Sequence, residues 1–260
     1  MCRSLKISIL LLLLPGVCAS AEIEWTIAPY LWASDVGMDI TLDDESSVGT
    51  EVGFKDLLDK VDMAFMGHIE GKGEKFGAYF DIISLDLSDT KIATIGPGEP
   101  ISGDVTVDLE LSLTIYELAG LYRFGNASPG NIEFDLIAGA RQLEIDAPFT
   151  LTVPPAVPGP FPLEGKLDIS ETDFLLGGRL LGYFNERWGY NLRADYSAGG
   201  TDGVLNAHAL IAYTFGQTGL FTLTGGYRYL TIELEDDADS LKSQTDLAMS
   251  GPLIGFVFNF

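Results

Sequence analysis

The sequence contains two histidines, His68 and His208, on which acid–base chemistry near neutral pH would depend. His208 follows Asn206 by two residues and has no acidic neighbour, whereas His68 shares a strand face with Glu70. A hydrolase needs a serine beside its histidine and a third group that orients the histidine. Ser197 precedes His208 on the neighbouring predicted strand, but alternation alone makes such pairs common. The residues therefore predict no catalytic site, and each histidine is expected to be hydrogen-bonded in the interior.

One acidic group near the C-terminus is a candidate for metal binding. Glu233, Glu235, Asp236, Asp237 and Asp239 lie close together, but they lack the glycine and the final glutamate of a calcium loop. They could bridge through divalent cations to lipopolysaccharide phosphates, although a solvated loop is the simpler interpretation. The sequence therefore predicts no metal site and no cofactor.

Most other charged residues lie where polar and apolar side chains alternate, which is the pattern of a β-strand with two different faces. Between Arg187 and Ala198, for example, the aromatic and aliphatic residues occupy one face, and Arg193 and Asp195 occupy the other. A closed sheet with polar faces inside and apolar faces outside satisfies both sets. The expected interior network consists of Glu70, Asp81, Glu117, Arg123, Glu133, Asp135, Arg141, Asp173, Arg179, Arg193, Asp195, His208 and Arg228.

The last ten residues, Gly251–Phe260, indicate what lies outside that sheet. Ile254, Phe256, Phe258 and Phe260 share one strand face, and this apolar row is costly in water but favourable in a bilayer. The stretch resembles the C-terminal strand of Gram-negative outer-membrane β-barrels, which the assembly machinery reads as an assembly signal. Gly255, Phe256, Phe258 and Phe260 carry that resemblance, and Leu253 departs from it where the family prefers a polar residue.

The whole chain resembles small porin-like or outer-membrane-protein-A-like barrels, a largely uncharacterised group. The matching elements are Phe54–Phe65, Tyr79–Asp81, Gly226–Leu230 and Gly251–Gly255. The resemblance implies an all-β, closed antiparallel transmembrane β-barrel. It also implies residence in the outer membrane, contact with its lipid and lipopolysaccharide, and partners among the barrel-assembly machinery and periplasmic chaperones. It lends no activity.

The N-terminus predicts export. Arg3 and Lys6 precede an apolar run from Ile7 to Val17, and residues 19–21 read Ala-Ser-Ala, as in a secretory signal with its cleavage site. We expect residues 1–21 to be removed and residues 22–260 to form one barrel domain. Both cysteines lie in the leader, so the mature chain would have no disulfide. The formal net charge of −23 argues against binding to nucleic acid.

Alternation and turn residues predict about ten strands, with twelve as an alternative if Ser34-Asp35 is a turn and eight as the lower one. Phe54–Val61 has the spacing of a short amphipathic helix, which we expect to be a loop helix. Counting back from a periplasmic C-terminus, the short connections fall on one side and the long ones on the other. Trp25, Tyr30 and Trp32 are expected as anchors at the membrane interface.

The strand that runs to Phe124 alternates almost perfectly between Asp104 and Ile115. In a membrane barrel its apolar side would face lipid, and a bulge near Tyr116 would return Glu117 to the interior.

Three functions remain open at this stage. The interior charges favour a structural network, because buried ion pairs mainly satisfy one another. A narrow passive channel is the other form of this hypothesis, with surplus carboxylates favouring cations. The alternatives are a lipid or peptide hydrolase, since ten-stranded outer-membrane proteases have a similar size, and an adhesin or receptor that acts through the loops Asp43–Lys60 and Ala147–Pro162. The oligomeric state is left open.

Overall fold

The computed structural model of the chain describes residues 23–42, 46–52, 61–95, 103–152, 163–216, 219–236 and 243–260. All regular structure within these ranges is β-strand. No helix in them is long and apolar enough to cross a bilayer. The predicted leader lies outside the described residues. So does the predicted helix over Phe54–Val61, except for Val61, which begins a strand.

Twelve strands are present in the described part of the chain. They are β1 (Glu24–Trp32), β2 (Asp35–Leu42), β3 (Ser46–Val52), β4 (Val61–Lys72), β5 (Phe76–Ile95), β6 (Gly103–Ser128), β7 (Asn131–Thr152), β8 (Leu163–Tyr183), β9 (Trp188–Ala198), β10 (Gly203–Phe215), β11 (Phe221–Asp236) and β12 (Ser243–Asn259).

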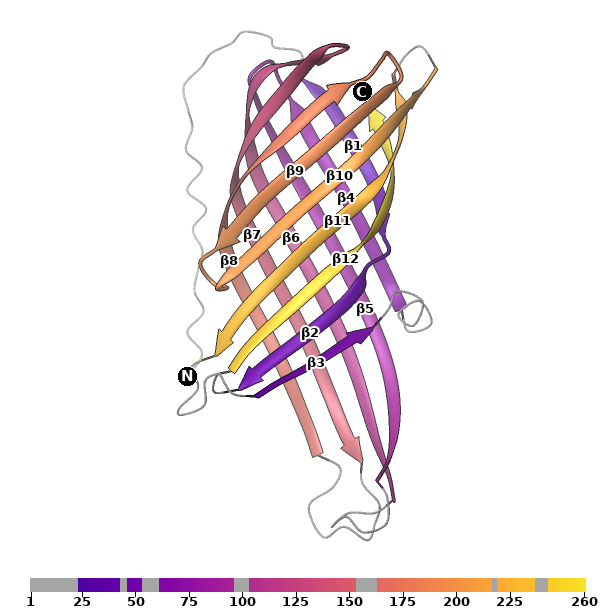
Figure 1. Cartoon of the computed structure of the whole chain (residues 1–260), viewed down its shortest axis with the longest axis vertical. Helices are drawn as coiled ribbons and strands as arrows, with labels where there is room; N and C mark the ends of the chain where they lie inside the picture. Colours follow the sequence, from indigo (N-terminus) through magenta and orange to yellow (C-terminus); the bar gives the residue numbers. More distant parts are fainter. Residues whose placement is uncertain are drawn as a thin grey trace.

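Ten of these strands form a closed antiparallel barrel (Figure 1). Each strand from β4 to β12 pairs with its neighbour in sequence, β1 pairs with β4, and β1 also pairs with β12 to close the ring. Closure leaves no sheet edge within the ring, which is the condition for a sheet to cross lipid. The predicted fold class and strand number are therefore confirmed.

The remaining strands, β2 and β3, bear on the choice between ten and twelve strands in the barrel. Trp32 of β1 pairs with Leu253 of β12, and Asp35 of β2 pairs with Ser250 of the same strand. β1 and β2 thus pair with β12 as one continuous strand that bends at Ala33 and Ser34. At this bend the amide of Ala33 donates to the carbonyl of Pro252 at 2.9 Å. The twelve-strand alternative is wrong, and β3 is an additional strand paired to β2.

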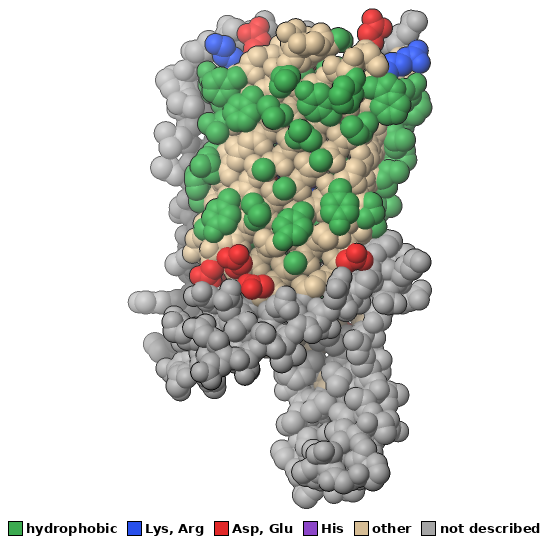
Figure 2. All heavy atoms as spheres, in the orientation of Figure 1, with side chains coloured by type: hydrophobic (Ala, Val, Ile, Leu, Met, Phe, Trp, Pro, Cys, Tyr) green, Lys and Arg blue, Asp and Glu red, His purple; other side chains and the backbone are tan. Residues whose placement is uncertain are grey.

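The exterior of the barrel carries an apolar belt. On β7 the outward side chains from Ile132 to Ala140 are all apolar, and Leu118 and Phe174 project from the neighbouring strands with 64% and 65% of their surface exposed. Residues 132–140 at about 3.3 Å each, tilted by about 40°, span roughly 23 Å, close to the apolar band of about 25 Å in such barrels. The face drawn in Figure 2 carries hydrophobic side chains over the middle of the barrel wall, with charged groups above and below them.

Beyond this belt the outward faces of four long strands become polar without any change of parity. Outward Ile82 of β5 is followed by Ser84 and Asp86, and the same change occurs at corresponding levels of β6, β7 and β8. Neighbouring strands are joined there by Ser112 donating to Asp86 at 2.7 Å and Gln142 donating to Ser170 at 3.1 Å. We call residues 84–95, 103–114, 142–152 and 163–172 the extramembrane sheet.

Two neighbouring strands of the barrel wall, β1 and β4, separate at the same level. The ladder between β1 and β4 ends where Pro29 pairs with Gly67, and Gly67 pairs with Ile82, the last lipid-facing residue of β5. Unpaired backbone is costly in lipid and can be hydrated in water. The ring is therefore fully paired where the belt would contact lipid, and its strands separate only beyond it.

Candidate functional site in the barrel lumen

The polar side chains predicted for the interior all lie inside the barrel. Most are buried, and Arg123 and His208 are partly exposed to the lumen. The buried members are Glu70, Asp81, Glu117, Glu133, Asp135, Arg141, Asp173, Arg179, Arg193, Asp195 and Arg228. We call this set, with Arg123, His208 and Lys72, the ion-pair layer.

Arg141 of β7 lies at the centre of this layer with 1% of its surface exposed. Its Nη2 lies 2.8 Å from Oε1 of Glu117 and 2.5 Å from Oδ1 of Asp195, and its Nη1 donates to Ser197 Oγ at 2.9 Å. Arg193 of β9 contacts the second oxygen of each carboxylate, at 2.7 Å from Glu117 and 2.6 Å from Asp195. Two guanidinium groups thus share two carboxylates.

A second cluster joins β4, β6, β7 and β8. Arg179 donates to both oxygens of Glu70, at 2.6 and 2.9 Å, and to Asp135 at 2.7 Å. Arg123 lies 3.0 Å from Glu133, and Lys72 reaches the same carboxylate at 2.7 Å. Glu70, Glu133 and Asp135 thus each have a cation within ion-pair distance, so these three acids are neutralised inside the barrel and do not favour cation selectivity.

Asp173 has a different environment from the other acids. It accepts hydrogen bonds from the hydroxyls of Ser197 and Thr201, at 3.0 and 2.7 Å, and from the backbone amides of Gly200 and Thr201. A carboxylate with several such donors is stabilised without a cation. Asp173 therefore stabilises the turn between β9 and β10 through these hydrogen bonds.

The two histidines occupy opposite sides of the lumen. His68 has Nδ1 at 3.1 Å from Asp81 and Nε2 at 3.3 Å from Glu70, so both ring nitrogens face carboxylates. His208 faces Asn191 Oδ1 at 3.4 Å. Ser197 is paired with Val204, and His208 lies four positions further along β10. The Ser197–His208 pair considered for hydrolysis is therefore not formed.

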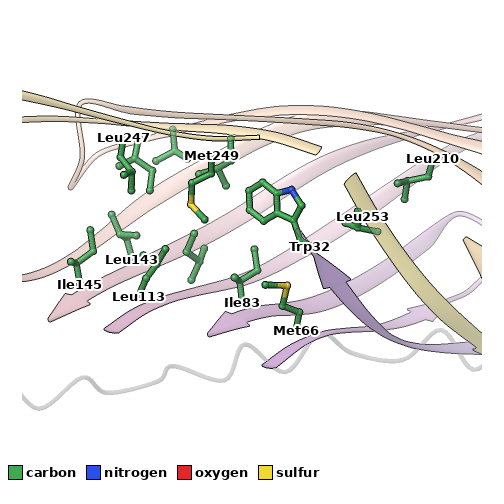
Figure 3. Close-up of a cluster of buried hydrophobic side chains, with 14 residues drawn as sticks. Trp32, Met66, Ile83, Leu113, Leu143, Ile145, Leu210, Leu247, Met249 and Leu253 are labelled. Atoms are coloured by element: carbon green, nitrogen blue, oxygen red, sulfur yellow. The ribbon is translucent and has the colours of Figure 1, made fainter. Parts of the chain in front are cut away.

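An apolar layer fills the lumen on the outer side of the ion-pair layer (Figure 3). Ile83, Leu143 and Leu230, with 2% or less of their surface exposed, point inward there with Trp32 and Met249. These apolar side chains occupy the same alternate positions of their strands as the charged groups. The strand face that points into the lumen therefore stays the same, and only the medium outside the barrel changes. The extramembrane sheet is thus built like a soluble sheet, with apolar side chains in and polar side chains out.

This layer corrects two predictions. Leu113 and Ile115 of β6 point inward together with Glu117, and pairing is continuous through Tyr116, so the predicted bulge is wrong. Tyr30 and Trp32 also point inward, and only Trp25 of the three expected anchors is outward, with 50% of its surface exposed. Tyr30 donates to Asp81 at 2.8 Å.

Arg228 of β11 connects the two layers. Its Nε donates to Asn206 at 2.9 Å, its Nη1 donates to the Tyr30 hydroxyl at 3.2 Å, and its guanidinium lies 5.1 Å from the centre of the Trp32 ring. Sequence reasoning did not identify Tyr30, Trp32 or Lys72 as interior groups. For Tyr30 and Trp32, the available signal was that both occupy even-numbered positions of the first strand, on the same face as the polar residue Thr26.

A cavity of about 270 Å³ remains on the other side of the ion-pair layer. It lies toward the end of the barrel that carries the short turns and the C-terminus, which Figure 1 marks with C. Its lining includes Tyr30, His68, Arg193, His208 and Arg228. Within the residues that the structure describes, no group of three or more His, Cys, Asp or Glu side chains could hold a metal ion.

The predicted assembly signal lies at this end of the closing strand. Phe256, Phe258 and Phe260 point outward, and Phe260 exchanges backbone hydrogen bonds of 2.9 and 3.1 Å with Trp25. Gly255 faces inward, where a Cβ atom would lie 3.0 Å from the Cβ of Tyr30. Packing therefore also favours glycine at this position, because Tyr30 leaves little room for a Cβ atom.

No protein-family model and no curated protein sequence matches the chain. Among solved structures, the outer membrane protease OmpT from Escherichia coli aligns with a TM-score of 0.49 and 9% identity, over 92% of this chain and 96% of that chain. The translocator domain of the autotransporter NalP from Neisseria meningitidis aligns with a TM-score of 0.42 and 13% identity, over 91% and 88% of the two chains. The attachment invasion locus protein Ail of Yersinia pestis aligns with a TM-score of 0.30 and 8% identity, over 92% and 98%.

The class of protein follows from the geometry of the chain itself. A closed antiparallel ring of ten strands, an apolar belt outside it and charged groups within it are the features of a bacterial outer-membrane β-barrel.

Proposed function

We propose that the protein is an outer-membrane barrel that conducts no solutes and acts at the cell surface through its extramembrane sheet. The observation that carries this proposal is the filling of the lumen by two successive layers. Glu117 and Arg141 in the ion-pair layer, and Ile83 and Leu230 in the apolar layer, each have 1% or less of their surface exposed. A conducting pore would leave side chains at its narrowest level in contact with water.

The extramembrane sheet supports a role outside the membrane. β5 and β6 stay paired as far as Ile95 and Gly103, and twelve residues of β5 beyond the belt would extend about 40 Å along the strand. Such a sheet would present paired strands and their connections to a partner outside the membrane. This favours the adhesin or receptor hypothesis over the narrow channel and over the hydrolase, for which the Ser197–His208 pair is lacking.

Conductance of the purified, refolded protein in planar lipid bilayers tests the closed lumen. We expect no unitary current steps from the wild-type protein, because hydrated ions cannot cross the apolar layer. A general porin added to the same membrane serves as the positive control. Stable, cation-selective steps from the wild-type protein would contradict the proposal and support the narrow channel.

A further inference from the structure

Three nitrogen-bearing side chains of the cavity lie side by side on adjacent strands. His208 of β10 is directly paired with Arg193 of β9 and with Arg228 of β11, and all three line the cavity. Side chains paired in this way have Cβ atoms about 4.5–5.5 Å apart and are close neighbours on one wall of the barrel. We call these residues the basic arc.

The carboxylates of the ion-pair layer cover this arc incompletely. Arg193 uses Nε and Nη2 for its ion pairs with Asp195 and Glu117. Among the described residues the carboxylate within ion-pair distance of Arg228 is Glu117, whose Oε1 lies 3.8 Å from Nη2. No carboxylate lies within ion-pair distance of His208 among the described residues. The hydrogen bonds seen in the described part of the chain come from Nε and Nη2 of Arg193 and from Nε and Nη1 of Arg228.

The opposite wall of the cavity is already neutralised. Asp81 is engaged by His68 and Tyr30, and Glu70 by His68 and by two nitrogens of Arg179. A bound cation would have to compete with these partners. An anion at the basic arc would instead gain hydrogen bonds from donors that are held in place by the layer behind them, and such charge-assisted bonds are the strong ones.

The lining between the arc and the short-turn end is partly apolar. Leu210 and Ala212 follow His208 on β10, and Leu253 and Val257 line the same region from β12. We propose that this cavity binds a small organic carboxylate, whose carboxylate group contacts the basic arc and whose apolar body lies against these aliphatic side chains. The cavity of about 270 Å³ has room for a ligand of the size of a single ring that carries a carboxylate.

Benzoate is a suitable probe, and benzamide is its uncharged counterpart of nearly the same shape. Isothermal titration calorimetry on the refolded full chain in detergent micelles, with empty micelles as the blank, should show saturable binding of benzoate and none of benzamide. His208→Gln removes a member of the arc without leaving a carboxylate unpaired. It should weaken benzoate binding by about tenfold, the loss expected for one charge-assisted hydrogen bond.

Lys166→Gln is the control, because it removes a basic side chain on the half-exposed surface, away from the cavity lining. Benzoate affinity should stay within about twofold of wild type, since hydrogen bonds that the ligand does not use contribute nothing to its binding. Thermal unfolding followed by circular dichroism verifies that both variants are folded. The proposal is overturned if benzoate does not saturate, if benzamide binds equally well, or if His208→Gln and Lys166→Gln weaken binding to the same extent.

Discussion

Arg141→Ala should lower the free energy of unfolding by about 3–5 kcal/mol, the cost of removing one partner from a buried ion pair. The alanine side chain would leave Glu117 and Asp195 facing each other with less compensation, although both are almost fully buried. It would also remove the hydrogen bond to Ser197. Urea unfolding of the barrel in lipid vesicles, followed by tryptophan fluorescence, measures this change.

Two further variants identify the cause of that loss. Arg141→Met combined with Asp195→Asn should recover most of the stability, because one cation and one carboxylate are removed together and Arg193 keeps Glu117 as its counter-charge. Lys166→Ala should have no measurable effect, since Lys166 bridges Asp146 and Asp168 on a half-exposed surface. If Arg141→Ala is as stable as wild type, the ion-pair layer does not hold the barrel together.

Leu136→Arg should destabilise the barrel by about 2–4 kcal/mol, the cost of an arginine at the bilayer midplane. Leu136 is outward-facing at the middle of the apolar stretch of β7, and Glu144 lies on the same face of the same strand, in the extramembrane sheet. Glu144→Arg should therefore change stability by no more than about 0.5 kcal/mol, as surface substitutions usually do. Unfolding in lipid vesicles measures both variants. Equal effects at the two positions would mean that the belt does not end where the outward face becomes polar.

The difference between these two positions also explains how far the sequence could predict the structure. Alternation placed Arg193 and Asp195 inside and Leu192 and Tyr196 outside, and the structure has them there. The ring of ten strands followed from the same pattern and from the turns. Within the belt, lipid outside and ionisable groups inside leave only one orientation for each strand.

Beyond the belt the same alternation places apolar side chains inside the barrel and polar side chains outside it. Leu113 and Ile115 alternate with Ser112 and Thr114, and alternation does not state whether water or lipid lies outside. Assuming lipid along the whole strand required a bulge at Tyr116 that does not exist. Trp32 was misplaced for the same reason, because an aromatic residue suits both an interface and an apolar interior. Partners across the lumen, such as Arg179 and Glu70, are 109 residues apart in sequence, and no local signal connects them.

Single-cysteine labelling on intact cells tests most directly that lipid covers one segment of the barrel wall and water the next. Glu144→Cys and Leu136→Cys place thiols on the same face of β7, in a mature chain expected to contain no other cysteine. A membrane-impermeant maleimide should label Glu144→Cys on intact cells and leave Leu136→Cys unlabelled until the protein is unfolded. Labelling of Leu136→Cys on intact cells, or protection of Glu144→Cys, would contradict the proposed position of the membrane.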